Sequence, residues 1–373
     1  MTHTTHTAAA DNDRPDAGGV AGDGAVGVAG GYRVGVDIGG TKIEAVAVDA
    51  HGAIVADRRI PARRGGDNVV EDVAGLVRDM VADVVVAGAT GGAAGCGADS
   101  TGPGLAGVVA SVGIGTPGRV DSATGHVSNI VNLDVDELAL GPRVSECLDG
   151  VPVTVENDVN AAAVGAAHAL GGGPGGGPGG GDTQGDGGAA GVAGSGSTVV
   201  LNFGTGFAAG ILIDGVLQHG VSGACGEIGH IPIDPNRFPC PCGQAGCLET
   251  VCSGSAVARL WPVPPDSGTA PMPDLIARAR AGEPEAERVL AMVTHAIGDG
   301  LQIVVQTVDP DVIILGGGMA KTGAPLVEAV RDELARREAT CPFLAGLHVG
   351  DRLRLAPTAV PLGAYGAAVM VRD

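Results

Sequence analysis

The chain has 373 residues, 45% of them hydrophobic, which is enough for a sizeable core in one large domain or two ordinary ones. Its 22 lysines and arginines stand against 42 aspartates and glutamates, so the net charge of −20 repels nucleic acid and anionic membrane surfaces. We therefore expect no nucleic acid and no membrane among its partners.

Residues 1–31 contain no apolar stretch of the kind found in a signal peptide, and they predict a disordered tail. No later stretch reaches the ~18 uninterrupted apolar residues that a membrane-spanning helix needs. These features predict a cytoplasmic protein, whose thiols stay reduced. In that compartment the eight cysteines favour a metal site over disulfides.

The first predicted elements form a β-hairpin. Residues 32–37 and 43–48 have the apolar pattern of strands, and the glycine-rich turn 38–41 joins them. Residues 69–86 have helical spacing with a charged face, and the apolar run 107–114 is typical of a buried strand. The ordered part of the chain therefore opens as an α/β unit.

The middle of the chain continues the α/β pattern and then breaks it. A strand is predicted at 151–155, and an alanine-rich helix is predicted at 159–170. Residues 87–104 are rich in glycine and alanine, and residues 171–196 contain the run GGGPGGGPGGG. Both of these segments predict mobile surface insertions.

The opening scheme of strand, glycine-rich turn and strand recurs at 198–203, 204–206 and 208–213. Two such turns that face each other across a cleft are what a nucleotide site split between two related lobes requires. The later predicted elements are a helix at 285–308, a strand at 312–315, a turn at 316–318 and a helix at 325–337.

The glycine-rich turns are candidate phosphate-binding sites. Residues 37–42, DIGGTK, combine an acid at a strand end with glycines, a hydroxyl and a cation. An ordinary hairpin turn is the alternative for this motif alone, and it is not a P-loop because GxxxxGK[ST] is absent. Together with the turns at 204–206 and 316–318, it favours phosphate binding.

Glu156, Asn157 and Asp158 end one predicted strand and open a helix. Asn or Asp at this place is often a helix N-cap, which is the simpler interpretation of the triplet alone. A carboxylate at a strand end that faces a cleft is also well placed to take a proton from a hydroxyl, as phosphoryl transfer requires. Both interpretations remain open at this point.

The strongest motif is a cluster of metal ligands. His230 is followed by Cys240, Cys242 and Cys247 in a loop rich in Gly and Pro, which gives the Cys₃His set that suits tetrahedral zinc. Four protein ligands leave no open position, so we expect a structural zinc. A loop held in this way would aim the flanking Glu227 and Glu249 at one polar ligand, such as the hydroxyls of a sugar.

Taken together, these motifs resemble the ROK family of sugar kinases and sugar-responsive repressors from about residue 33 to the C-terminus. The shared pieces, in family order, are DIGGTK (37–42), GIGTPG (113–118), ENDVNAAA (156–163), FGTGFAAG (203–210), GEIGH (226–230), CPCGQAGCLE (240–249) and GGG (316–318). The resemblance implies an α/β, actin-like ATPase (ribonuclease H-like) fold, with two lobes around a nucleotide cleft.

The resemblance also implies a role for each residue of the site. Asp158 would be the general base that deprotonates the sugar hydroxyl, and His230 would touch both sugar and zinc. The implied sugar-binding residues are Gly118, Asn132, Asn157, Asp158, Glu227, His230 and Glu249. The implied residues for ATP and Mg²⁺ are Asp37, Gly39, Gly40, Thr41, Lys42, Gly204, Thr205, Gly206, Gly317 and Gly318.

The chain departs from the family pattern at three places. Val135 stands where many sugar kinases of the family carry Trp, Ala166 follows Gly165 where Glu is common, and Ala208 replaces a Gly of the second phosphate turn. None of these changes removes a catalytic group. Polyphosphate-using relatives generally lack the cysteine loop, so the resemblance favours ATP as the donor.

We therefore expect an ATP-dependent kinase that converts glucose to glucose 6-phosphate. Kinases of N-acetylglucosamine, N-acetylmannosamine or fructose are the alternatives, and a sugar-responsive regulator without catalysis is a more distant one. The expected organisation is a lobe at 32–157, completed by a C-terminal helix at 361–373, and a lobe at 158–360 with the zinc loop 226–249. We also expect a homo-oligomer, a dimer or a tetramer.

Overall fold

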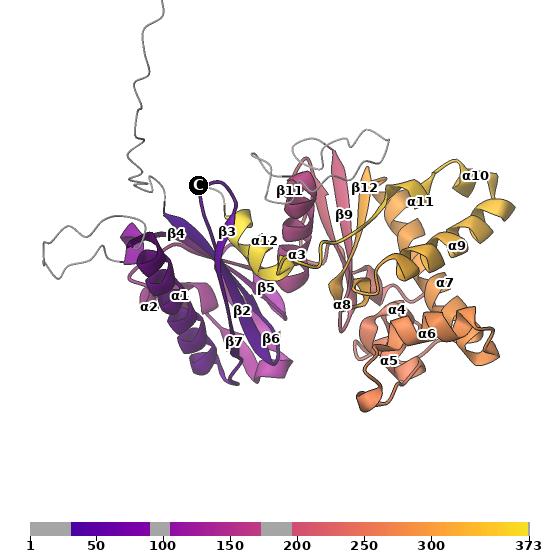
Figure 1. The fold of residues 1–373 in the computed structure, drawn as a ribbon, viewed down its shortest axis with the longest axis horizontal. Helices are drawn as coiled ribbons and strands as arrows, with labels where there is room; N and C mark the ends of the chain where they lie inside the picture. Colours follow the sequence, from indigo (N-terminus) through magenta and orange to yellow (C-terminus); the bar gives the residue numbers. More distant parts are fainter. Residues whose placement is uncertain (1–30, 90–104, 173–195, 372–373) are drawn as a thin grey trace, which may run out of the picture.

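The computed structural model describes residues 31–89, 105–172 and 196–371. The predicted tail 1–31 and the predicted insertions 87–104 and 171–196 lie outside the described residues, apart from the few positions at their ends. The described residues form two α/β lobes that lie side by side (Figure 1).

The first lobe is built on a five-stranded sheet with the order β3-β2-β1-β4-β8. β1 pairs antiparallel with β2 and parallel with β4, and β4 pairs parallel with β8. Its elements are β1 (Tyr32–Ile38), β2 (Lys42–Val48), β3 (Ile54–Pro61), α1 (Gly66–Ala89), β4 (Val109–Thr116), β5 (Arg119–Asp121), β6 (His126–Ile130), β7 (Val135–Leu138), α2 (Leu140–Cys147) and β8 (Val153–Asn157).

The second lobe repeats this plan with the sheet order β11-β10-β9-β12-β13. β9 pairs antiparallel with β10 and parallel with β12, and β12 pairs parallel with β13. The helix α3 (Asp158–Ala167) packs on β9 and β10 of this lobe. The other elements of the lobe are β9 (Ser197–Phe203), β10 (Phe207–Ile213), β11 (Val216–Leu217), α4 (Glu249–Cys252), α5 (Gly254–Leu260), α6 (Pro271–Arg280), α7 (Pro284–Thr307), β12 (Val312–Gly316), α8 (Gly317–Ala320), α9 (Ala324–Thr340), α10 (Pro342–Ala345), α11 (Val349–Arg352) and β13 (Leu353–Leu355).

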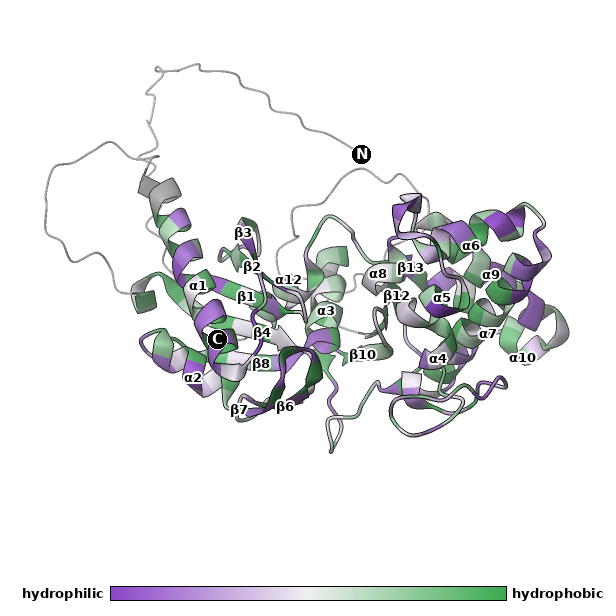
Figure 2. Cartoon of the chain, turned by 90° about the horizontal axis from the view of Figure 1, so that it is seen from below, coloured by the Kyte–Doolittle hydropathy of each residue, from purple (hydrophilic) through white to green (hydrophobic). Residues whose placement is uncertain are grey.

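Each lobe has its own core, and each core is aliphatic. Buried Val, Ile, Leu and Ala from the sheet of the first lobe pack on the inner face of α1, whose outer face is polar (Figure 2). In the second lobe the sheet packs on α7, α9 and the short helices around them, with Phe203 stacked on Phe207 at 4.8 Å between ring centroids. The aromatic-poor composition therefore still fills two separate cores.

The last helix, α12 (Leu362–Met370), returns from the second lobe to the first. It packs on β1, β4 and α3, and in Figure 1 it lies beside α3 between the two sheets. Glycines make this approach possible. A Cβ on Gly366 would lie 1.7 Å from the carbonyl oxygen of Ala161, and a Cβ on Gly165 would lie 2.2 Å from that of Leu362.

The strands and helices predicted from the sequence are confirmed, with shifts at their ends. The helix α1 extends three residues beyond the predicted range 69–86 at each end. The strand β8 runs from Val153 to Asn157, two residues later than predicted, because its pairing with β4 continues beyond the apolar residues. The turn predicted at 316–318 needs correction, because Gly317 already begins the short helix α8.

One described helix, α7, is long and apolar enough to cross a membrane by length and composition, with 56% of its most apolar window buried inside the structure. Its buried face contributes to the core of the second lobe through residues such as Val293, Ile297 and Leu301. A core helix of this kind passes the same composition test, so α7 gives only weak grounds for a membrane span.

Candidate active site

The carboxyl ends of three parallel strands bring polar residues of the first lobe together. In the register of the sheet, Asp37 of β1 pairs with Gly115 of β4, and Gly115 pairs with Glu156 of β8. Ligands of open α/β sheets bind at this edge, where the chain leaves the strands. The predicted site residues Asp37, Asn157 and Asp158 therefore share one edge of one sheet.

Asn157 fills one of the two roles that the sequence left open, that of the helix N-cap. Asn157 is the N-cap of α3, and its Oδ1 accepts hydrogen bonds from the backbone N–H of Val159 at 2.9 Å and of Asn160 at 3.4 Å. The carboxylate of Asp158 also accepts a hydrogen bond from the Val159 N–H, at 2.9 Å. Because Asn157 already caps the helix, Asp158 is free for another task.

Both aspartates at this edge hold protons more tightly than an exposed carboxyl. Burial raises the pKa of Asp158, against the lowering effect of the Val159 N–H. Burial, followed by the negative charges of Asp158 and Glu44, raises the pKa of Asp37 to about 7. Two buried carboxyls with raised pKa values suit a site that takes up a proton or a divalent cation.

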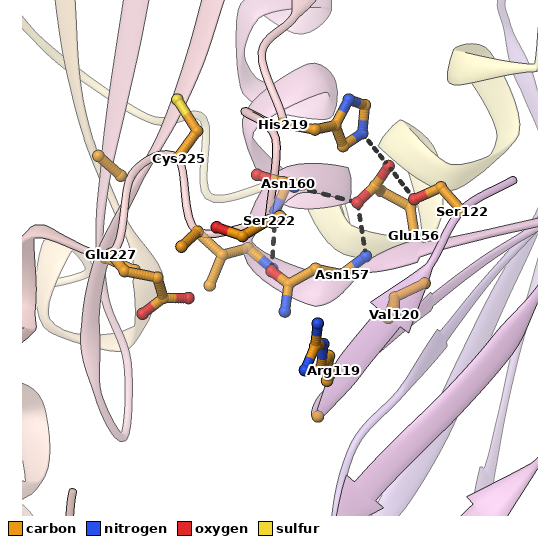
Figure 3. Close-up of a pocket in the computed structure, with 16 residues that line it drawn as sticks. Arg119, Val120, Ser122, Glu156, Asn157, Asn160, His219, Ser222, Cys225 and Glu227 are labelled. Carbon is orange, nitrogen blue, oxygen red and sulfur yellow. Dashed lines mark hydrogen bonds and ion pairs between the residues drawn. The ribbon is translucent and has the colours of Figure 1, made fainter.

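A pocket of about 430 Å³ opens between the two lobes beside Asn157 (Figure 3). Of the predicted sugar-binding residues, Gly118, Asn157 and Glu227 line it, whereas Asn132, Asp158, His230 and Glu249 are not in its wall. Its lining residues are Gly118, Arg119, Val120, Ser122, Glu156, Asn157, Val159, Asn160, Ala208, Ala209, His219, Ser222, Gly223, Ala224, Cys225 and Glu227.

Several polar residues of the pocket were missed by the sequence analysis. Arg119 follows Gly118 and lies near Asn157 in the pocket view (Figure 3). Glu156 is only 5% exposed and accepts hydrogen bonds from Ser122, Asn157, Asn160 and His219. Glu156 had a signal, since it stands in the same triplet as Asp158, but His219 lies in no recognisable motif.

The first glycine-rich turn lies beside a residue predicted to bind the sugar. The N–H of Gly39 donates to the carbonyl of Lys42 at 2.9 Å and closes the turn. A Cβ on Gly40 would lie 2.9 Å from the Cβ of Asn132, so only glycine allows this approach without movement of Asn132. The turn that was predicted to hold phosphate is thereby packed against Asn132.

The second glycine-rich turn is held by the segment that follows the cysteine loop. The N–H of Gly254 donates to the carbonyl of Gly204 at 2.9 Å, and Ser255 donates to the carbonyl of Thr205. Glu249 accepts a hydrogen bond from the N–H of Phe207 at 3.0 Å and leaves no room for a Cβ on Gly206. Glu249 therefore lies beside the predicted phosphate turn.

The third glycine-rich turn lies next to the second. Gly316 pairs with Asn202 at the carboxyl ends of β12 and β9. Gly317 has a φ of +80°, and a Cβ there would lie 2.5 Å from Oδ1 of Asn202. Nothing within 4 Å would meet a Cβ on Gly318. The residues predicted for the nucleotide in this lobe thus share one sheet edge, as Asp37 and Asp158 do in the other lobe.

The four predicted zinc ligands come together. The ligand atoms of His230, Cys240, Cys242 and Cys247 all lie within 4.8 Å of one another. Sγ of Cys240 is 3.7 Å from Nδ1 of His230, and Sγ of Cys242 is 3.6 Å from that of Cys247. Tetrahedral zinc with Zn–S bonds of about 2.3 Å spaces its ligand atoms about 3.7 Å apart. The cluster therefore fits zinc.

The environment of this cluster also suits a metal. The backbone N–H and then the side-chain amide of Gln244 lower the pKa of Cys242 to about 6, which favours the thiolate that binds metals. Burial raises the pKa of Cys240 and Cys247, so these two thiols need the positive charge of a metal to ionise. The other ring nitrogen of His230, Nε2, is 3.9 Å from a carboxylate oxygen of Glu227. His230 thus joins the cysteine cluster to a residue of the pocket wall.

The comparisons with known proteins agree with this geometry. The sequence profile of the ROK family matches residues 100–172 and 189–373. The chain belongs to the ROK family. The matched region contains every predicted site residue except Asp37 and the first glycine-rich turn, which precede it.

Members of known activity match over almost the whole chain. A glucokinase of Halalkalibacterium halodurans is 28% identical over 92% of this chain and 95% of its own. A ROK hexokinase of Thermus thermophilus is 29% identical, with a TM-score of 0.65 over 91% of this chain and 97% of its own. A ROK glucokinase of Streptomyces griseus, solved with glucose and AMPPNP, is 28% identical, with a TM-score of 0.62 over 91% of this chain and 99% of its own.

These structures confirm the fold expected from the sequence, an α/β, actin-like ATPase fold. The two lobes with equivalent sheets belong to that fold.

Proposed function

We propose that this protein phosphorylates a hexose with ATP, and that glucose is its substrate. The observation that carries the proposal is the carboxyl of Asp158 at the start of α3, with a raised pKa, next to a pocket between the lobes. The glucokinases of Halalkalibacterium halodurans and Streptomyces griseus, which match the chain over more than nine-tenths of its length, support glucose.

In this proposal Asp158 takes the proton of the sugar hydroxyl as the hydroxyl oxygen bonds to the γ-phosphorus of ATP. The bond between that phosphorus and the bridging oxygen breaks, and ADP leaves. A base with a raised pKa accepts the proton more readily at neutral pH than an exposed carboxylate does. The products are a sugar phosphate and ADP, with the proton on Asp158.

The sugar would be held by acceptors and donors from both lobes. Asn157 and Gly118 belong to the first lobe, and Glu227 belongs to the second. We keep Asn132, His230 and Glu249 as proposed sugar ligands, because each lies next to a pocket or phosphate residue in the described contacts. Closure of the lobes would bring these residues to the pocket.

ATP would bind between the glycine-rich turns of the two lobes. Gly39 to Lys42 would face it from the first lobe, and Gly204 to Gly206 with Gly317 and Gly318 from the second. We propose that Asp37 serves a Mg²⁺ ion, which neutralises charge on the phosphates. The raised pKa of Asp37 supports a cation at this place, because a bound Mg²⁺ would favour the ionised carboxylate of Asp37.

We propose that the Cys₃His cluster holds a structural zinc, which supplies rigidity to the loop between Glu227 and Glu249. The spacing of the ligand atoms supports zinc, and the full ligand set leaves no position for a reacting water. A site of reduced thiols suits the cytoplasm, which we propose as the location of the protein. We also propose a homo-oligomer, a dimer or a tetramer.

The test is ADP release measured by a coupled assay over a panel of sugars. With ATP and Mg²⁺ present, glucose should give the highest kcat/KM, ahead of N-acetylglucosamine, N-acetylmannosamine and fructose. A higher kcat/KM for a hexosamine or for fructose would show that glucose is not the preferred substrate, and the proposed sugar kinase reaction would stand. If none of these sugars leads to release of ADP, the proposal is wrong.

A further inference from the structure

Glu156 is the most heavily bonded residue of the pocket wall. Its Oε1 accepts hydrogen bonds from the N–H of Asn157 at 2.8 Å and from Nδ2 of Asn160 at 3.0 Å. Its Oε2 accepts from Oγ of Ser122 at 3.1 Å and is 2.6 Å from Nε2 of His219. Figure 3 shows the carboxylate at the centre of these four partners.

These contacts leave Glu156 no capacity to bind a sugar. A carboxylate offers about four lone-pair sites, and all four are taken by the partners named above. A sugar hydroxyl could reach this buried carboxylate only by displacing one of these partners, which would then lose its own hydrogen bond. Glu156 thus acts through the residues that it holds.

Two of its partners set the start of α3. The hydrogen bond to the N–H of Asn157 fixes the peptide that joins Glu156 to Asn157, and the bond to Asn160 fixes the first turn of the helix. Asp158 lies between these two points. The two hydrogen bonds therefore fix the backbone on both sides of Asp158.

A third partner reaches Glu156 from the other lobe. His219 follows β11 and begins the segment that carries Ser222 to Glu227 along the pocket. Its carbonyl accepts a hydrogen bond from the N–H of Cys225 at 3.2 Å, which closes this segment into a loop. The contact between His219 and Glu156 therefore links the loop that ends at Glu227 to the strand end that carries Asn157.

We propose that Glu156 is a positioning residue that aligns Asp158 and, through His219, holds the loop of residues 219–227 of the second lobe against the first. The inference deepens the proposed function and rests on it for the catalytic consequence. The alignment of the loop itself can be tested in the ligand-free protein.

The catalytic test compares Glu156→Ala with Glu156→Gln. A displacement of about 1 Å at a reacting group can cost 10²-fold in rate, so kcat of Glu156→Ala should fall about 100-fold. Glu156→Gln keeps the oxygen that accepts from Asn157 and Asn160, so its kcat should return to within about 10-fold of the wild type. His219→Ala should mainly raise the sugar KM, by about 10-fold, because it releases the loop and leaves α3 in place.

Glu333 offers a matched control for burial and charge. It is 6% exposed, it accepts from Nε of Arg337 at 2.8 Å, and it lies in α9 away from the pocket. Glu333→Ala should lower the melting temperature and leave the kcat of the folded protein unchanged. If Glu156→Ala behaves like Glu333→Ala, with stability lost and kcat retained, the positioning role is wrong.

Hydrogen exchange of the ligand-free protein separates this inference from the proposed function. Amides of residues 157–160 and 219–227 should exchange faster in Glu156→Ala than in the wild type, and those of α9 should not. Unchanged exchange in both segments would overturn the inference even if the enzyme is a sugar kinase. A wild type that phosphorylates no sugar would contradict the proposed function, and the exchange result would still decide whether Glu156 holds the loop.

Discussion

Asp158 is the residue whose replacement tests the proposed chemistry most directly. Asp158→Asn keeps the shape of the side chain and an oxygen that accepts from Val159, but the amide does not take up the proton. We expect kcat to fall by roughly 10² or more, with sugar binding largely retained. Steady-state kinetics and a sugar titration measure the two effects.

Asp311→Asn is the control for this change. Asp311 accepts hydrogen bonds from the N–H and Oγ of Ser197, at 2.7 and 3.2 Å, at the other end of β9 from the glycine-rich turn. Its replacement should affect stability without a change in kcat. Turnover of Asp158→Asn equal to that of the wild type would remove Asp158 from the mechanism.

The raised pKa of Asp37 predicts how the free energy of unfolding depends on pH. Its pKa rises from 3.8 to about 7 on folding, chiefly by burial, so the folded protein holds this proton in a range where the unfolded chain has lost it. Stability therefore falls as the pH rises from about 4 to about 7. Asp37→Asn removes this contribution, so its advantage in unfolding free energy over the wild type should grow across that window.

The measurement is urea unfolding of both proteins at a series of pH values, without Mg²⁺ or nucleotide. Near pH 4 the two free energies should be similar, because the wild-type carboxyl is then protonated when folded. A constant difference between the two proteins from pH 4 to pH 8 would show that Asp37 does not titrate in this way.

The sequence predicted those residues whose chemistry is visible in a short motif. Asn157 and Asp158 could be assigned to a strand end, and the Cys₃His set could be found from its spacing. The link between Glu156 and His219 could not, because it joins positions 63 residues apart and depends on how the lobes meet. Nothing in the local sequence of His219 distinguishes it from an exposed histidine.

The zinc loop, residues 226–249, depends for its order on the proposed zinc ligands. Its regular structure consists of one 3-10 turn, Ile228–His230, and one isolated β-bridge between Pro239 and Ala245. Cys242→Ser should therefore lower the metal content, raise the sugar KM and reduce stability together. His230→Ala should weaken sugar binding further, because Nε2 of His230 faces Glu227 at 3.9 Å.

Metal analysis of purified protein beside a sugar titration checks this prediction, with about one zinc per chain expected in the wild type. Cys341→Ser is the matched control, since Cys341 lies at the start of α10, outside the cluster. Unaltered sugar affinity in a zinc-free Cys242→Ser protein would show that the metal does not organise the loop.

Helices and strands could be predicted from the sequence where the spacing of apolar residues matches the face that packs on the core. The strands of both hairpins and the helices α1, α7 and α9 have apolar residues spaced as their packing requires. The short helices α4, α5 and α8 were not predicted, because four to seven residues give no period to detect. Their ends are set by tertiary contacts, such as the approach of Gly254 to Gly204.

At the scale of the whole molecule, the two lobes are variations of one plan. β1, β2, β3, β4 and β8 correspond in sheet order to β9, β10, β11, β12 and β13. A helix follows the last strand of each sheet and packs on the sheet of the opposite lobe: α3 follows β8 and packs on β9 and β10, and α12 follows β13 and packs on β1 and β4. The repeated glycine-rich turns predicted two related lobes. The close contact of α3 with α12 depends on Gly165 and Gly366, which no local sequence pattern distinguishes from other glycines.

Those glycines support a prediction about how the lobes are joined. α12 follows the second lobe in sequence and packs on the first, so its contact with α3 helps to fix one lobe against the other. A Cβ on Gly366 would lie 1.7 Å from the carbonyl oxygen of Ala161 and 2.6 Å from the nitrogen of Gly165. Both atoms belong to the backbone, so Gly366→Ala must push the two helices apart.

We expect Gly366→Ala to lower the free energy of unfolding by about 3 kcal/mol, the upper range for overpacking of a tight core. Gly75→Ala is the matched control, because Gly75 also lies inside a helix, α1, and nothing within 4 Å would meet its Cβ. That change should stabilise the protein by up to about 1 kcal/mol through helix propensity alone. Urea unfolding of the two variants measures both effects. A Gly366→Ala protein as stable as Gly75→Ala would mean that α12 can move away from α3 at no cost, and that the lobes are joined by other contacts.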